Sequence, residues 1–148
     1  MRNQQVEKIG RQVSTLYRQT QKFINRRMQP YGLKYSDHAF LIYIAKNPGL
    51  NQRRLARLLS IDEAVVTRVL KKLEENGFVR RERDPEDLRS FCLYLTARGE
   101  ELIPALLETF NALDSVLTQG FDTASLITLR TQLEKMTDNA CAANGEEL

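Results

Sequence analysis

The sequence has few of the residues on which most enzymes and metal sites depend. It contains one His, two Cys and no Trp among 148 residues. Cys92 and Cys141 are far apart in the sequence and form no CxxC pair or His/Cys cluster, so neither a zinc site nor a structural disulfide is expected. Because a glycine-rich phosphate loop is also missing, we expect no enzyme activity, no bound metal and no cofactor.

Long apolar runs are missing as well. No segment has the uninterrupted apolar length that a bilayer span needs, and the first residues, Met1 to Gln5, are not followed by the apolar stretch of a secretory signal. We therefore expect a cytoplasmic protein without a membrane partner. The length fits one compact domain.

Charge is unevenly distributed along the chain, although the net charge is only +3. Residues 1–30 carry a net charge of +6 and residues 51–83 a net charge of +4, whereas residues 91–148 carry −6. A basic middle segment is typical of proteins that bind an anionic partner. Taken alone, this signal is weak.

Helical periodicity covers most of the chain, with apolar residues recurring every three or four positions. It predicts helices over residues 5–28, 37–46, 52–59, 63–76, 97–119 and 123–140, and N-caps at Ser36, Asn51, Asp62 and Thr96. The period changes to two in residues 78–83 and 90–95, which a polar turn joins, so these segments predict a two-stranded hairpin. The predicted fold class is mainly α, with an α+β wing.

Two short helices, 52–59 and 63–76, are joined by a tight link and predict a helix-turn-helix. Leu55, Ala56, Leu58 and Leu59 are expected to face inward. The second helix would enter a major groove, because an α-helix fits there and base edges carry a unique code. Its predicted base-reading residues are Glu63, Ala64, Val65, Thr67 and Arg68, and its predicted phosphate contacts, with those of the preceding helix, are Arg53, Arg54, Lys71 and Lys72.

The predicted hairpin directly follows the helix-turn-helix, which is the position of the wing in a winged helix-turn-helix. Arg89 lies near its tip, and guanidinium groups favour narrow, electronegative minor grooves. Asp87, two residues earlier, could hold Arg89 in place. The alternative interpretation of this pair is a surface ion pair of roughly 0–1 kcal/mol.

Three stretches of this region carry a family resemblance: Leu55 to Asp62, Val66 to Val79, and Asp84 to Ser90 continuing into Leu95 to Gly99. Together they combine a Gly-aromatic-Val helix exit, an Asp-x-Arg wing and a Leu-Thr-x-x-Gly start of a long helix. The sequence closely resembles the MarR family of bacterial regulators, from about residue 8 to residue 136.

This resemblance implies a function and an assembly. It implies an intertwined homodimer in which residues 1–34 and 97–148 are the dimerisation helices and residues 35–96 the DNA-binding region. It implies a pseudo-palindromic operator on double-stranded DNA, minor-groove insertion of Arg89 supported by Asp87, and repression relieved by a small-molecule effector. The early cysteine of some redox-sensing relatives is missing here, so that mechanism does not transfer.

The resemblance also points to an effector pocket between the dimerisation helices and the winged core. Aromatic and basic side chains near that junction, which a phenolic or carboxylic effector could use, are Tyr17, Arg18, Tyr31, Tyr35 and His38. Tyrosines at helix ends are more often packing residues with a solvated hydroxyl. The alternative function is a winged-helix protein-interaction module without DNA binding, against which the basic residues argue.

Overall fold

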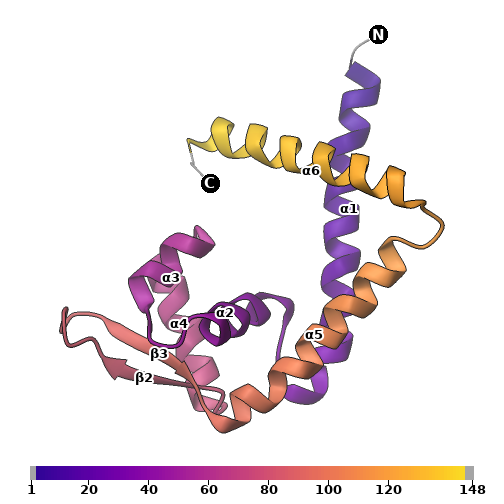
Figure 1. The fold of residues 1–148 in the computed structure, drawn as a ribbon. Coiled ribbons are helices and arrows are strands. Elements are labelled where there is room, and N and C mark those ends of the chain that lie inside the picture. Colours follow the sequence, from indigo (N-terminus) through magenta and orange to yellow (C-terminus); the bar gives the residue numbers. More distant parts are fainter. Residues whose placement is uncertain (1–2, 146–148) are drawn as a thin grey trace. The chain divides into compact units, whose positions relative to one another are not determined.

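The computed structural model describes the backbone of residues 3–145 and the side chains of residues 9–145. The chain forms two compact units, residues 1–113 and residues 114–148. In chain order the elements are α1 (Asn3–Met28), the short 3-10 helix η1 (Gln29–Tyr31), α2 (Tyr35–Lys46), β1 (Leu50–Asn51), α3 (Gln52–Leu59), α4 (Glu63–Glu75), β2 (Val79–Arg83), β3 (Phe91–Leu95), α5 (Ala97–Leu117) and α6 (Thr123–Asn144) (Figure 1). The predicted fold class, mainly helical with a small antiparallel sheet, is confirmed. No helix in the part that is described is long and apolar enough to cross a bilayer.

The sheet contains one strand more than the sequence predicted. Its order is β1-β3-β2, and both pairings are antiparallel. β2 and β3 form the expected hairpin, with Val79 opposite Leu95 and Arg83 opposite Phe91. β1 adds only Leu50 and Asn51, opposite Leu93 and Cys92. Two residues are too few to show an alternating pattern, which explains why β1 escaped the sequence analysis.

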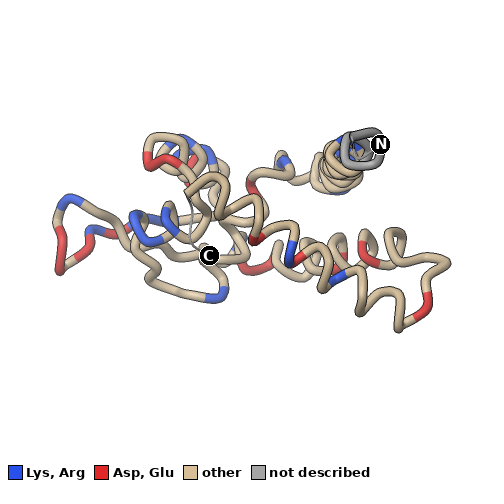
Figure 2. Tube along the Cα trace, turned by 90° about the horizontal axis from the view of Figure 1, so that it is seen from above, with Lys and Arg blue, Asp and Glu red and all other residues tan. Residues whose placement is uncertain are grey.

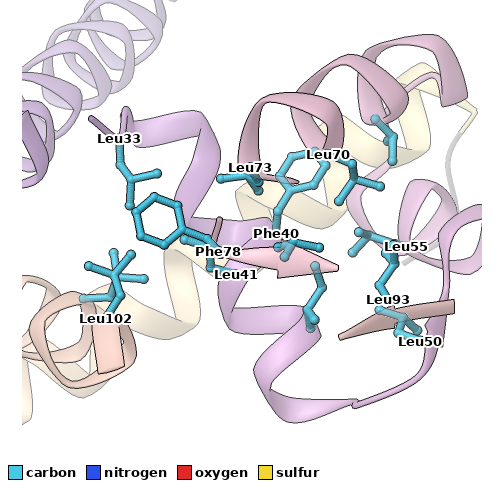
Figure 3. Close-up of a cluster of buried hydrophobic side chains, with 14 of the residues drawn as sticks. Leu33, Phe40, Leu41, Leu50, Leu55, Leu70, Leu73, Phe78, Leu93 and Leu102 are labelled. Carbon is cyan, nitrogen blue, oxygen red and sulfur yellow. The ribbon is translucent and has the colours of Figure 1, made fainter. Parts of the chain in front are cut away.

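A single apolar core holds α2, α3, α4 and the sheet together. Leu55 of α3, Leu70 and Leu73 of α4 and Leu93 of β3 are completely buried. Figure 3 shows these side chains converging around Phe40 and Leu41 of α2, with Phe78 lying toward Leu33 and Leu102 at one end. The apolar residues of α4 pack into this core, and the opposite face of the helix is therefore exposed to solvent.

Two local predictions were wrong, and a third is confirmed only in position. α2 begins at Tyr35, not after Ser36, because the carboxylate of Asp37 accepts a hydrogen bond from the backbone N–H of Lys34 at 2.8 Å. Asp62 is the N-cap residue of α4 as predicted, but its side chain makes no capping hydrogen bond. Leu58, expected to face inward, is 47% exposed. By contrast, Asn51 caps α3 as predicted, with its side chain accepting from the N–H groups of Arg53 and Arg54.

Two glycines are needed where α4, the hairpin and α5 meet. Gly77 has a φ of +74°, a left-handed conformation that ends α4 as the sequence predicted. Gly99, in the first turn of α5, lies so close to Phe78 that a β-carbon would be 2.1 Å from its carbonyl oxygen. Thr96 accepts a hydrogen bond from Gly99 N–H at 3.1 Å and so caps α5. The Leu-Thr-x-x-Gly stretch thus joins the wing to α5.

Apolar side chains remain uncovered in both units. On α1, Ile9, Val13 and Leu16 are about half exposed, at 47%, 51% and 48%. In the second unit α6 has no buried residue, and Leu129, Leu133 and Met136 are 43%, 45% and 41% exposed. Helices of this kind normally bury such a stripe against another element.

Candidate DNA-binding interface

The outer face of α4 carries most of the predicted base-reading residues. Glu63, Ala64, Thr67 and Arg68 are exposed, as is Lys71 one turn further on. Val65 is half-buried. The buried residues Val66, Leu70 and Leu73 anchor the other side of the helix in the core. The side chain of Arg68 is exposed, and its guanidinium forms no ion pair within the described residues.

A tight turn sets the angle between α3 and α4. Ser60 adopts a left-handed conformation, with a φ of 51°, and the N–H of Ile61 donates to the carbonyl of Ala56 at 3.1 Å. Ala56 is 4% exposed, so its small side chain lets the two helices approach. α3 and α4 therefore form the predicted helix-turn-helix.

The first turn of α3 connects α4 to the wing, here defined as residues 79–95. The side-chain amide of Asn51 donates to the carboxylate of Asp84 at 2.5 Å. Arg53 forms an ion pair with Asp87 at 3.2 Å and a longer one with Glu63 at 3.9 Å. The N-terminal end of α3 therefore contacts both the exposed face of α4 and the wing. Arg53 was predicted to contact phosphate, and its guanidinium lies between the carboxylates of Asp87 and Glu63.

The tip of the wing is held in a defined conformation. Nη1 of Arg83 donates to the carbonyl of Leu88 at 2.7 Å, and the backbone N–H of Arg89 donates to Oδ1 of Asp87 at 3.1 Å. Asp87 therefore holds Arg89 through its backbone, while the other carboxylate oxygen binds Arg53. Among the described residues, Asp87 forms no ion pair with the Arg89 guanidinium, which was the alternative interpretation. Arg89 is exposed and Leu88 is 70% exposed. Figure 2 shows basic and acidic residues side by side on this wing.

Lys72 differs from the other predicted phosphate contacts. Its ammonium lies 2.6 Å from Oδ2 of Asp37, whose side chain is 2% exposed. Lys72 thus ties α4 to α2 and is half-buried, whereas Arg54 and Lys71 are exposed. Sequence analysis missed this pair because Asp37 and Lys72 are 35 residues apart. We leave Lys72 out of the proposed DNA contacts.

Cys92 lacks the surroundings of a redox sensor. Burial raises the pKa of the Cys92 thiol, and the nearby carboxylates of Asp84 and Glu86 raise it further. A thiol becomes reactive as its thiolate, which these surroundings disfavour. No group of three His, Cys, Asp or Glu residues in the described part of the chain could hold a metal ion.

Three of the five predicted effector-pocket residues lie together. The rings of Tyr17 and Tyr35 meet edge to face with centroids 5.7 Å apart, and His38 stacks between Tyr35 and Phe110 at 4.8 and 4.6 Å. Burial lowers the pKa of His38 despite opposing effects of the Tyr35 carbonyl and Asp37. A cavity of about 290 Å³ adjoins this histidine, lined by His38, Ala39, Ile42, Tyr43, Leu107 and Phe110.

The other two predicted pocket residues lie elsewhere. Arg18 is exposed and its guanidinium donates to the hydroxyl of Thr15 at 3.2 Å. Tyr31, in η1, is 42% exposed and does not line this cavity. The cavity is therefore more apolar than the sequence suggested: its lining surface is almost entirely apolar, although His38 and Tyr43 are among the lining residues.

The comparisons with known proteins agree with this architecture. The family model described as "MarR family" matches residues 33–91. The HTH-type transcriptional regulator BilQ of Clostridium symbiosum is 32% identical over 77% of this chain and 79% of its own length. The crystal structure of a MarR transcriptional regulator from Methanosarcina mazei superposes with a TM-score of 0.84 at 32% identity, covering 93% of this chain and 99% of that one.

A more distant neighbour shares the fold. A mutant MarR from Escherichia coli, solved in complex with operator DNA, superposes with a TM-score of 0.81 at 22% identity, covering 89% of this chain and 95% of that one. A fold match to the M. mazei protein along nearly its whole length, and the similarity to BilQ, extend well beyond the helix-turn-helix. The chain belongs to the MarR family of transcriptional regulators.

Proposed function

We propose that this regulator binds a pseudo-palindromic operator as a homodimer, with α4 of each subunit in a major groove and the wing beside it. The observation that carries the proposal is the arrangement around α3: Arg53 links the exposed face of α4 to a wing whose tip presents Arg89. Arg68, Thr67 and Ala64 would select bases. Arg54 and Lys71 would bind phosphates, and Arg89 would enter the minor groove.

Two further observations support this model. The uncovered apolar stripes of α1 and α6 are what a dimer interface would bury. The E. coli relative was solved with operator DNA, and its fold is the same. Two reading heads about one helical turn apart would make the operator nearly symmetric.

The proposal is tested by selecting duplexes from random DNA and measuring binding at two salt concentrations. A palindromic motif bound with a steep salt dependence supports a specific dimeric regulator, since phosphate contacts release counterions. A chain that selects no motif and binds all duplexes alike would contradict it. Binding that resists salt and involves another protein would instead favour an interaction module.

Arg68→Ala tests the base contact within the selected motif. We expect affinity for the motif to fall by roughly 1–3 kcal/mol and one base position to lose its preference, because a bidentate guanine contact is lost. Lys71→Met is the matched control and should weaken motif and random DNA equally. Equal losses for Arg68→Ala on both DNAs would show that Arg68 only binds phosphate.

The regulator would act as a repressor whose operator affinity falls when a small aromatic carboxylic or phenolic effector enters the cavity beside His38. An effector can shift affinity only if it binds the DNA-free conformation better. With benzoate as the probe, we expect weaker operator binding by the wild type and a smaller effect for His38→Phe, which keeps the ring but removes its polar atoms. Unchanged binding at all benzoate concentrations would contradict this effector class.

A further inference from the structure

Gln52 forms a hydrogen bond between the two helices of the helix-turn-helix. The sequence did not indicate this residue. It is the first residue of α3 and is half-buried. Its amide Nε2 donates to the hydroxyl oxygen of Thr67 in α4 at 2.9 Å. Thr67 is exposed on the proposed base-reading face. A residue of the supporting helix therefore acts directly on a residue of the recognition helix.

The hydroxyl of Thr67 has little hydrogen-bonding capacity left for DNA. It donates its one hydrogen to the carbonyl of Glu63, one turn earlier in α4, at 2.8 Å. It accepts from Gln52 at the same time. Both contacts draw the oxygen toward the protein, so the methyl group is the part of this side chain that remains for a base edge.

The contact with Gln52 also fixes the rotamer of Thr67. In a helix threonine divides between two χ1 rotamers, since its hydroxyl can bond to a carbonyl of the preceding turn. A second bond from a neighbouring helix favours one rotamer over the other. The direction of the methyl group is therefore set before DNA binds.

The other end of the Gln52 amide argues against a purely stabilising role. Its Oε1 is buried and, among the described residues, has no hydrogen-bond partner. Turning the amide over would place the amino group there instead, and the hydroxyl of Thr67 would still be engaged. An unsatisfied buried polar atom costs stability, so an apolar side chain would stabilise this position better.

We propose that Gln52 is a positioning residue that makes Thr67 read the methyl group of a thymine rather than hydrogen-bond to a base. The inference rests on the proposed function, because it needs α4 in a major groove. Thymine is the base whose major-groove edge carries a methyl group, against which a threonine methyl packs. Thr67 would then contribute one thymine preference to each half-site.

The test removes methyl groups on both sides of the contact. Each thymine of the selected motif is replaced in turn by uracil, which lacks only the methyl group, symmetrically in both half-sites. At one position we expect affinity of the wild type to fall about fourfold per half-site, the value of one buried methyl-sized group. Thr67→Val keeps the methyl shape without the hydroxyl and should retain this loss, whereas Thr67→Ser should bind both DNAs within about twofold of each other.

Gln52→Leu supplies the second arm of the test. We expect the thymine-to-uracil ratio to shrink in Gln52→Leu, because Thr67 regains its second rotamer. In a Thr67→Val background the same change should leave the ratio unaltered, since valine makes no bond to Gln52. The ratio is independent of overall stability, and urea unfolding of each variant confirms that it is folded.

Four results would overturn the inference. A wild type that discriminates at no thymine, a Thr67→Ser variant that keeps the discrimination, or a Thr67→Val variant that loses it would each do so while specific binding persists. A folded Gln52→Leu variant that keeps the wild-type thymine-to-uracil ratio would show that Gln52 does not position Thr67. A wild type that selects no motif at all contradicts the proposed function itself, and this inference with it. The two failures are therefore distinguishable in the same experiment.

Discussion

Lys72→Met is expected to lower the free energy of unfolding by about 2 to 3 kcal/mol, somewhat less than the cost of breaking a fully buried ion pair. The carboxylate of Asp37 is almost completely buried and, among the described residues, would keep the N–H of Lys34 at 2.8 Å as its partner. The loss is smaller than for a fully buried pair because the side chain of Lys72 itself is 38% exposed. Urea unfolding at a fixed protein concentration measures the change.

The neighbouring lysine is the matched control. Lys71 is 70% exposed and its ion pair with Glu75 is 3.9 Å long, so Lys71→Met should change stability by less than about 0.5 kcal/mol. For DNA binding we expect the opposite ranking of the two substitutions. Lys71→Met should reduce the salt dependence of binding by about one unit for each lost phosphate contact, and Lys72→Met should leave it unchanged.

A second substitution separates the ion pair from the loss of the lysine side chain. Adding Asp37→Asn to Lys72→Met should restore part of the stability, because an amide can accept from the N–H of Lys34 without needing a counterion. If Lys72→Met is as stable as the wild type, the carboxylate of Asp37 does not depend on this partner. In that case Lys72 returns to the set of candidate phosphate contacts.

Periodic features were predicted from the sequence and side-chain pairs were not. The apolar spacing in α4 predicts that Val66, Val69, Leu70 and Leu73 face the core; three of them are buried, and Val69 is half-buried. The positive φ of Gly77 followed from its place after a helix. Such features depend on neighbours within a few residues, which the sequence displays directly.

Contacts between distant segments depend on how the elements pack. Arg53 and Asp87 are 34 residues apart, and Gln52 and Thr67 are 15 apart. The spacing of a polar residue along a helix sequence is the same whether its side chain faces solvent or the carboxylate of a neighbouring element. The sequence therefore predicted the exposed face of α4 but not the contacts that the first turn of α3 makes with it.

Leu133→Lys is expected to dissociate the proposed dimer. Leu133 is 45% exposed in the centre of a stripe with Leu129 and Met136 on α6. Fully burying a leucine side chain is worth about 1.5 to 3 kcal/mol, so burying the exposed 45% of Leu133 is worth about 0.7 to 1.4 kcal/mol, and a two-fold interface would lose this contribution twice. A total of about 1.4 to 2.7 kcal/mol corresponds to a dimer weakened by roughly tenfold to a hundredfold.

Sedimentation velocity over a range of concentrations measures this change, with Thr131→Lys as the control. Thr131 is exposed on the opposite side of α6 and its hydroxyl donates to the carbonyl of Ile127, so a lysine there adds the same charge away from the stripe. Operator affinity should fall with the dimer in Leu133→Lys, because two linked reading heads bind far more tightly than one. The first compact unit, residues 1–113, has its own core and should stay folded. A Leu133→Lys protein that sediments as the wild type does would show that this stripe of α6 lies outside the subunit interface, and would leave α1 as the remaining candidate.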